Sequence, residues 1–353
     1  MLHPTNIPDC APELECLLDF QERLLDFACA NSSFDKTALV SGFGQDIADW
    51  LSGNNIRQRL LDRLKEIING GTDAERKELL DKFKHDRAFI RYIDDTTFRF
   101  ELEVNESSSD FLKKAKKFLV GHYEQLKDSG FHPAVCSHSA TGFTDKHWWA
   151  GYRKANPGLR TCSICDASLS AAGETIEHYF PKGQYPALST HPANLLPLCK
   201  ICNSEIKGEK DPLGSELITD IFLPYHHDIR RNVRLAFQDD GYGGYKVDLI
   251  PANGDPTTKK RVENIEKLFE ISKRWSKALE EISETAESRA RAYIEVMRDF
   301  GRPINAETIP GYIEAACSQM ERNWGRTNYE YVATEWLRWA KTNKPSLVSA
   351  LVS

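Results

Sequence analysis

Leucine and phenylalanine recur at helical spacing through most of the segment 1–130. This pattern predicts helices over 12–30, 45–69 and 73–92. Gly70 and Gly71 form the stop between the last two, and Thr72 is suited to be the N-cap of the third. The N-terminal region is therefore predicted to be mainly helical.

In the next segment the hydrophobic pattern changes from helical spacing to alternation. Residues 96–104 (TTFRFELEV) alternate apolar and polar side chains, which predicts a strand. A serine-rich turn over 106–110 then leads into a basic helix over 110–127. The lysines of this helix at 113–117 are typical of a solvated helix face.

The C-terminal part begins with a predicted β-hairpin over 233–251, whose two alternating arms flank an Asp-Gly and Gly-Gly turn. Three or four helices should follow, with segments at 259–282, 284–301, 309–320 and 329–341. The Gly-Arg-Pro sequence at 301–303 is predicted to separate the second from the third. The pattern as a whole favours an α+β, predominantly α-helical protein.

The composition is that of a folded protein in water. The chain has 353 residues, of which 41% are hydrophobic and 28% charged, and this length suits two or three domains. No apolar run approaches the ~18 residues of a membrane span, and the first residues lack a basic-then-apolar leader. We therefore expect a cytoplasmic protein with no membrane partner.

The net charge of −6 hides a change of sign along the chain. Residues 1–145 carry 18 basic and 25 acidic side chains, 146–210 carry 8 and 5, and 211–353 carry 20 and 22. The middle window, at +3, is the net-positive one, although chance variation of a solvated surface is an alternative explanation. Any nucleic-acid binding by the isolated chain is thus predicted to be weak and salt-sensitive.

Four of the nine cysteines form two Cys-x-x-Cys pairs, Cys162 with Cys165 and Cys199 with Cys202, and the segment 166–198 separates the pairs. Each pair can grip one side of a tetrahedral ion, so four thiolates predict structural Zn²⁺. A redox role would need one pair in a thioredoxin-like βαβ context, which the pattern lacks. The remaining cysteines are predicted to be buried or partly buried free thiols.

The segment between and after these pairs carries a further pattern. Glu177-His178, Pro181, Asn194-Leu195-Leu196 and Asn203, which directly follows Cys202, with Lys207 resemble the HNH endonuclease motif of the ββα-metal fold. The form is the one with a four-cysteine zinc knuckle, and the resemblance covers the segment 162–207. It implies a central zinc-stapled HNH module over 131–215, between a helical region over 1–130 and a region over 216–353 with the hairpin and further helices.

The resemblance also implies residue roles. His178 would be the general base, because a neutral imidazole can accept a proton from water. Glu177 and Asn203 would hold Mg²⁺ or Mn²⁺ through oxygen, and Asn194 would tie the loop that positions the histidine. Some family members have histidine, a second metal ligand, where this chain has Lys207, so we expect Lys207 to contact phosphate instead.

Each role has a structural alternative: an ordinary histidine, a loop asparagine or a solvated lysine. His191, in the loop of the motif, is expected to be solvent-exposed. His226 and His227 lie in a basic segment over 224–234 that either lines the same groove or is a surface turn, and whether one of them supports the metal stays open.

Basic and aromatic side chains interleave just before the first cysteine pair. Such a segment can neutralise phosphates and stack on bases, or its tryptophans can anchor the module to the helical part. The candidate DNA contacts are Lys146, Trp148, Trp149, Arg153 and Lys154.

The combined hypothesis is a metal-dependent HNH endonuclease acting on DNA. The wording of the motif is similar to HNH nucleases of bacterial anti-phage systems, such as Septu-type systems and some retrons. That similarity implies a defence effector working with an ATPase or sensor subunit, or as a homo-oligomer. The alternatives are a restriction or mobile-element nuclease and a non-catalytic zinc-dependent nucleic-acid-binding adaptor.

Overall fold

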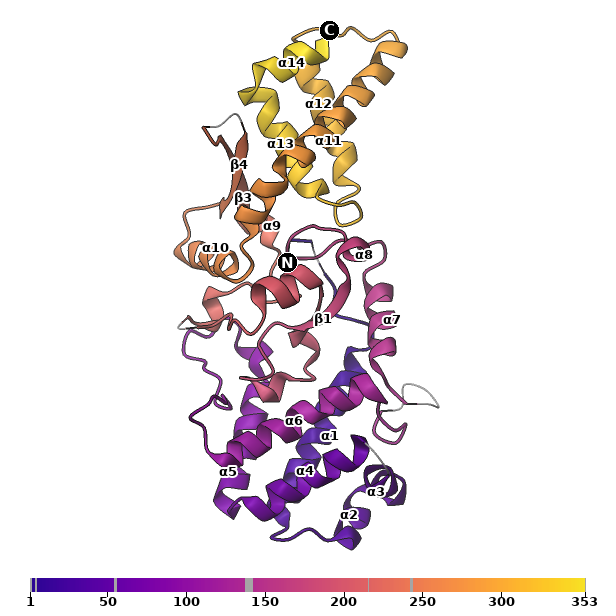
Figure 1. The fold of residues 1–353 in the computed structure, drawn as a ribbon, viewed down its shortest axis with the longest axis vertical. Helices are drawn as coiled ribbons and strands as arrows, with labels where there is room; N and C mark the ends of the chain where they lie inside the picture. Colours follow the sequence, from indigo (N-terminus) through magenta and orange to yellow (C-terminus); the bar gives the residue numbers. More distant parts are fainter. Residues whose placement is uncertain are drawn as a thin grey trace.

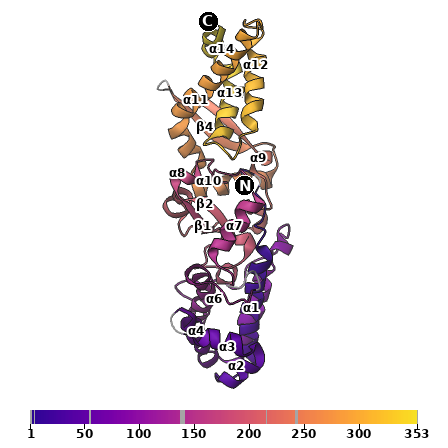
Figure 2. The ribbon, with the colours of Figure 1, turned by 90° about the vertical axis from the view of Figure 1, so that its right-hand side faces the viewer.

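The computed structural model describes residues 2–3, 5–53, 56–136, 142–214, 216–241 and 244–352. The molecule is elongated, with N-terminal helices at one end, a small two-stranded sheet in the middle and C-terminal helices at the other end (Figures 1 and 2). The predicted α+β, mostly helical class is confirmed. Among the described residues, no helix is long and apolar enough to cross a membrane.

The N-terminal helices are α1 (Ala11–Ala30), α2 (Lys36–Phe43), α3 (Gln45–Ser52), α4 (Ile56–Gly70), α5 (Asp73–Arg87) and α6 (Asp110–Asp128), with a 3-10 turn, η1 (Phe89–Tyr92), after α5. The N-cap prediction is confirmed, because Thr72 and Glu75 form a reciprocal capping box. The single helix predicted over 45–69 is wrong, since Gly53 ends α3 and α4 begins at Ile56; residues 54 and 55 lie outside the described part.

The strand predicted over 96–104 is also wrong. Its alternation reflects burial, with Phe98, Leu102 and Val104 inside, but no strand is paired with it in the part of the chain that the structure describes. The carboxylate of buried Asp86 instead accepts hydrogen bonds from the backbone N–H groups of Glu101 (2.8 Å) and Leu102 (2.9 Å). A side chain therefore satisfies the donors that a neighbouring strand would otherwise have paired.

The middle of the molecule contains α7 (Asp145–Ala155), α8 (Leu169–Ala172), β1 (Glu174–His178), η2 (Pro186–Leu188), η3 (Pro192–Asn194), β2 (Leu195–Cys199), η4 (Ile201–Lys207) and η5 (Ile218–Asp220). Strands β1 and β2 pair antiparallel, with Glu177 opposite Leu196 and His178 opposite Leu195. Segment η4 is a π-helix, closed by a 2.8 Å bond from the Gly208 N–H to the Asn203 carbonyl.

The C-terminal elements are α9 (Ile229–Asn232), β3 (Val233–Asp239), β4 (Tyr245–Pro251), α10 (Pro256–Phe269), α11 (Ile271–Asp299), α12 (Ile309–Glu321), α13 (Glu330–Asn343) and α14 (Pro345–Val352). The predicted hairpin is confirmed as β3 and β4, although residues 242 and 243 of its turn lie outside the described part. The predicted helix boundary near 283 is wrong. The break falls at Glu270, whose φ of 49° is left-handed, and α11 continues unbroken to Asp299.

Strand β2 lies between two hydrophobic cores. Leu195 belongs to the core of the N-terminal helices, whereas Leu196 and Leu198 belong to the core shared with the C-terminal elements. Every residue of β2 is buried. The sheet of the middle segment is thus covered by both helical regions, and this placement fixes the ends of β1 and β2, where the candidate residues lie.

Candidate functional site

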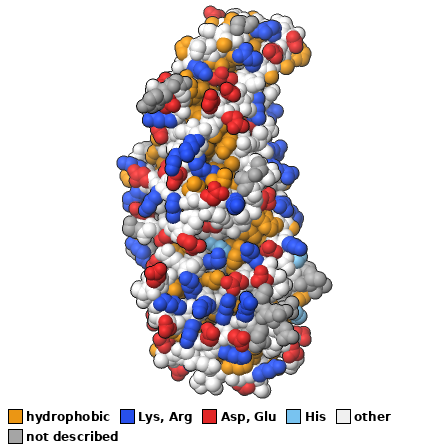
Figure 3. Space-filling view, viewed as in Figure 1, with side chains coloured by type: hydrophobic (Ala, Val, Ile, Leu, Met, Phe, Trp, Pro, Cys, Tyr) orange, Lys and Arg blue, Asp and Glu red, His pale blue; other side chains and the backbone are white. Residues whose placement is uncertain are grey.

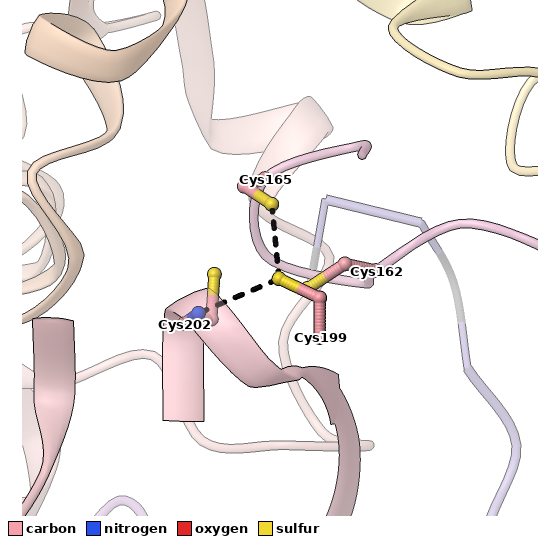
Figure 4. A group of neighbouring side chains, drawn as sticks. All are labelled: Cys162, Cys165, Cys199 and Cys202. Carbon is pink, nitrogen blue, oxygen red and sulfur yellow. Dashed lines mark hydrogen bonds between the residues drawn. The ribbon is translucent and has the colours of Figure 1, made fainter. Parts of the chain in front are cut away.

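The four paired cysteines converge on one point. Cys162 and Cys165 lie in the turn before β1, Cys199 ends β2, and Cys202 lies in η4 (Figure 4). Their sulfur atoms all lie within 4.8 Å of one another, and all four residues are buried. We call this group the cysteine cluster. The β1–β2 pairing thus brings together two Cys-x-x-Cys segments that are well separated along the chain.

The cysteine cluster has the geometry and chemistry of a site that can hold a metal such as zinc. A tetrahedral ion with ~2.3 Å bonds to sulfur separates its ligands by ~3.8 Å, and the Cys165 and Cys199 sulfurs are 3.8 Å apart. Burial raises the pKa of the Cys162 and Cys202 thiols, whereas the hydrogen bond from Cys162 lowers the pKa of Cys199. The four thiols cannot all ionise here without a cation.

Two side chains of helix α11 contact this cluster. The guanidinium of Arg274 donates from Nη1 to the Cys202 sulfur at 2.9 Å, and the indole of Trp275 donates to the Cys165 carbonyl at 2.9 Å. Arg274 therefore places one positive charge beside a group that would be doubly negative with Zn²⁺ bound to four thiolates. Such partners orient ligands and adjust metal affinity.

Asp166 connects the cysteine cluster to distant parts of the chain. Its φ is 61°, and its side chain is fully buried. One carboxylate oxygen lies 2.6 Å from Nε2 of His3, and the other accepts the backbone N–H of Tyr331 at 2.9 Å. The Asp166 carbonyl accepts from Tyr329 at 2.9 Å. The turn between Cys165 and β1 is thereby tied to both the first residues and the start of α13.

A second buried group lies at the end of β1. The ammonium of Lys207 is 2.5 Å from Oε1 of Glu177, 3.1 Å from the His178 carbonyl and 3.4 Å from the Gly208 carbonyl. The Lys207 side chain is 0% exposed and that of Glu177 is 9% exposed. Burial raises the pKa of Glu177, and the attraction of Lys207 opposes this effect. The expected phosphate contact of Lys207 does not fit this geometry, because its three N–H donors already have acceptors.

His178 is buried, and one of its ring nitrogens is fixed. Nε2 lies 2.9 Å from the Ser189 carbonyl, and a carbonyl only accepts, so Nε2 carries the proton. Burial is the main cause that lowers the pKa of His178 to about 3, with Lys182 next. The ring is therefore neutral near pH 7, with its lone pair on Nδ1.

Two further lysines surround this histidine. Tyr123 of α6 packs edge-on against the His178 ring with centroids 4.3 Å apart. The ammonium groups of Lys182 and Lys127 lie 5.5 Å and 6.0 Å from the centroid of the Tyr123 ring. Lys127 is exposed and Lys182 partly exposed, so their charges can reach an anion in solution.

Asn194 ties the loop between the strands. Its side-chain oxygen accepts the Phe180 N–H at 2.7 Å, and Nδ2 donates to the carbonyls of Phe180 (3.1 Å) and Leu188 (2.9 Å). Leu188 directly precedes Ser189, so Asn194 holds the loop that carries the Ser189 carbonyl. Asn203 is placed differently, because its Nδ2 donates to the Thr175 hydroxyl at 2.8 Å.

The expectation that His191 is solvent-exposed is wrong. It is 3% exposed; Nε2 donates to the Arg87 carbonyl (3.1 Å), and Nδ1 accepts the Ala193 N–H (3.2 Å). Its role is structural, and burial lowers its pKa to about 3. His226 lines a cavity of about 520 Å³ together with His191, and Nδ1 of His227 accepts the Leu223 N–H at 2.8 Å.

The basic and aromatic segment before the cysteines lies mostly in α7. Trp148 is fully buried and stacks on Tyr152, so the suggestion that it stacks on DNA is wrong. Trp149 is partly buried, and Lys146 is exposed. Arg153 pairs with Glu174 at 2.8 Å, and Lys154 pairs with Asp9 at 2.9 Å.

Acidic and basic side chains are intermixed on the face of the molecule that Figure 3 shows. Lys and Arg side chains alternate there with Asp and Glu along the length of the molecule. The positive charges of the 146–210 window are partly neutralised in this way, since Arg153, Lys154 and Lys207 have acidic partners. Outside the cysteine cluster, the prediction of buried or partly buried thiols is confirmed for Cys10, Cys29, Cys136 and Cys317 and is wrong for Cys16, which is exposed.

Several residues of the site were not found from the sequence. Lys182 lies within the motif and could have been noticed as its nearest cation. Tyr123, Lys127 and Arg274 come from α6 and α11, which are distant from His178 and the cysteines along the chain. No spacing rule connects such residues before the fold is known.

Comparison of this chain with models of known protein families, with curated proteins and with solved structures finds no match.

Proposed function

We propose that this protein is an HNH-type endonuclease that hydrolyses phosphodiester bonds in DNA. The observation that carries the proposal is the His178 ring, whose Nε2 is fixed by the Ser189 carbonyl at 2.9 Å while Nδ1 keeps the lone pair of a neutral imidazole. A general base must have an unprotonated nitrogen, as the neutral His178 ring has at Nδ1. His178 lies at the end of β1 beside Lys182 and Lys127. Asn194 supports it by holding the loop that carries Ser189.

In the proposed reaction, Nδ1 of His178 takes a proton from water while the water oxygen forms a bond to phosphorus. The bond between phosphorus and the 3′ oxygen breaks, and that oxygen takes a proton from solvent. The products are a 5′ phosphate and a 3′ hydroxyl. Lys182 and Lys127 attract the phosphate and reduce the cost of the charge that builds on it.

The side chains as they lie do not fit the Mg²⁺ or Mn²⁺ that the resemblance implies. The carboxylate of Glu177 already has a cation, the Lys207 ammonium at 2.5 Å, and Asn203 donates to Thr175. No group of three or more His, Cys, Asp or Glu ligands, apart from the cysteine cluster, occurs in the described ranges. The proposed cleavage therefore uses no divalent ion. Zinc is proposed for the cysteine cluster alone, in a structural role.

The test is plasmid nicking by the purified full chain. Replacing His178 with Ala should slow cleavage ~10²–10⁴-fold and leave the fold and DNA binding intact. His226→Ala is the matched control, because His226 is a partly buried histidine that lines a cavity without His178 and should keep wild-type cleavage. Equal nicking by wild type and His178→Ala, or no nicking with any partner or metal, would contradict the proposal.

We further propose that the nuclease is the effector of a prokaryotic anti-phage system and acts with a protein partner, an ATPase or sensor subunit, or as an oligomer. Near the end of α11, Phe300 is 75% and Val296 47% exposed, and apolar side chains of this size favour a partner surface. A restriction or mobile-element nuclease is the alternative within the same class of enzyme.

A zinc-dependent nucleic-acid-binding adaptor is the second candidate function. The cysteine cluster favours it, because such a module needs one structural ion and no base. The two functions differ in the effect of His178→Ala: an adaptor has no cleavage to lose, whereas the enzyme loses cleavage and keeps DNA binding.

A further inference from the structure

The Glu177–Lys207 pair occupies the place where the resemblance puts a divalent cation. Lys207 has three N–H donors and three acceptors within 3.4 Å: Glu177 Oε1, the His178 carbonyl and the Gly208 carbonyl. Its side chain is completely buried. The Lys207 ammonium uses all of its N–H donors and neutralises the buried carboxylate beside it. The bonded carboxylate oxygen therefore needs no further cation.

A divalent ion added here would meet unfavourable electrostatics. The site would then hold the ion and the Lys207 ammonium against the carboxylate in contact with them, Glu177, and the more distant charges of Lys182 and Glu209 have opposite signs. Mg²⁺ also requires near-octahedral oxygen ligands at ~2.0–2.1 Å, and the amide of Asn203 presents its nitrogen to Thr175. The local charge therefore opposes the binding of an ion.

We propose that Lys207 replaces the divalent ion of related sites, so that the His178 site excludes Mg²⁺ and Mn²⁺ and phosphodiester cleavage there is independent of both. The catalytic part of this inference rests on the proposed function. Lys207 is a positioning residue: it holds Glu177 and the carbonyl of His178, and so fixes the end of β1. The charges that face the phosphate are those of Lys182 and Lys127.

The first test measures Mn²⁺ binding by electron paramagnetic resonance, using the full chain with its zinc content verified. Wild type should show no saturable Mn²⁺ site tighter than ~1 mM. Lys207→Ala should gain a site that the double variant with Glu177→Gln lacks, while Lys182→Met should gain none. A wild-type Mn²⁺ site that Glu177→Gln abolishes would overturn the inference, and this wild-type result does not depend on whether Lys207→Ala folds.

The second test separates this inference from the proposed function. Wild type should nick plasmid equally well, within about twofold, with and without a chelator that leaves one zinc per chain, whereas Lys207→Ala should require Mn²⁺. If wild-type nicking instead needs Mn²⁺ and fails in Glu177→Gln, the metal-free inference is wrong and the nuclease proposal stands. If no nicking occurs at all, the nuclease proposal fails, and Mn²⁺ binding still decides whether the site excludes the ion.

Discussion

The cysteine cluster and the Glu177–Lys207 pair are two buried groups of ionisable side chains in the same small module. They differ in how their negative charge is neutralised. The cluster brings together four thiols that can ionise, and the cationic side chain bonded to it is Arg274. The pair joins one carboxylate to one ammonium at 2.5 Å. The first group can hold a metal ion from solution, whereas the second already contains its cation, the Lys207 ammonium.

The difference shows that likeness to a metal motif does not decide the charge that surrounds the candidate ligands. Spacing identified the cysteine cluster because four thiolates have few other uses at that geometry. The residue types of Glu177 and Asn203 also fit a metal-binding motif. The buried ammonium of Lys207, however, changes the charge around them. A cation site is therefore defined by the net charge of everything buried with its ligands.

The largest expected effect tests the cluster. Replacing Cys199 with Ser removes one of four ligands, and structural zinc sites hold their ion with ~10–16 kcal/mol of apparent free energy. We expect zinc content to fall from one ion per chain to none and the middle segment to lose its cooperative thermal transition. Elemental analysis and calorimetry measure both. Cys16→Ser, at an exposed thiol, should leave both unchanged; zinc retained by Cys199→Ser would contradict the tetrahedral assignment.

The next effect tests the pair. Lys207→Met leaves Glu177 buried without its cation, which should reduce the free energy of unfolding by about 3–5 kcal/mol. The double variant with Glu177→Gln should lose less, because the uncompensated charge is gone. Urea unfolding of zinc-loaded protein provides the double-mutant cycle. Losses that simply add would mean that the two side chains do not depend on each other.

A smaller effect tests whether Arg274 shares the charge of the cluster. Arg274→Met should weaken zinc binding about 10–100-fold, because it removes the donor 2.9 Å from the Cys202 sulfur. Competition with a coloured chelator measures the affinity. Arg231→Met is a suitable control, because that side chain is 86% exposed. An unchanged affinity would show that the thiolates need no cation besides the metal.

The smallest effect concerns His122, a buried side chain that stays neutral and so needs no counter-charge. Burial lowers the pKa of His122 in the N-terminal core from 6.5 to about 4. The unfolded chain therefore binds the extra proton first as pH falls below 6.5, so stability present above that pH is lost towards pH 4. We expect His122 by itself to contribute a loss of about 2 kcal/mol between pH 7 and pH 5, measured by urea unfolding as the difference in slope from the His122→Phe variant, because His178 and His191 lose stability over the same range. His122→Phe should make the slope shallower by this amount, whereas an identical slope would show that His122 does not contribute to the acid sensitivity.

Local patterns predicted the parts that local physics determines. The Thr72 cap and the β3–β4 hairpin follow from short-range spacing, and so does each Cys-x-x-Cys pair of the cysteine cluster; all of these predictions are confirmed. The strand predicted over 96–104 failed because Asp86, which belongs to α5 and lies outside that segment, satisfies its backbone donors. The break at Glu270 was missed because nothing in its residue type requires a left-handed φ.

The residues of the candidate site also separate into those that the sequence pattern identifies and those that only the fold reveals. His178 and Asn194 were identified by their order in the motif, but the burial of Lys207 and His191 depends on packing against segments from elsewhere in the chain. Lys207 was expected to contact phosphate because it stands where some family members have a metal-ligating histidine, and a protonated lysine cannot ligate a metal. Its burial becomes visible only when the fold places Glu177 within 2.5 Å.

The bonds of Asp166 have a consequence for the order in which the molecule assembles. Its partners, His3 and Tyr331, lie 163 and 165 residues away on either side. Contacts of such long sequence separation are slow to form, because a long loop must close before they contribute any stability. The turn that carries Cys162 and Cys165 should therefore become rigid late in folding, after both ends of this long span have arrived. A metal ion captured earlier would exchange with solution until that final closure, and would afterwards be held kinetically as well as by affinity.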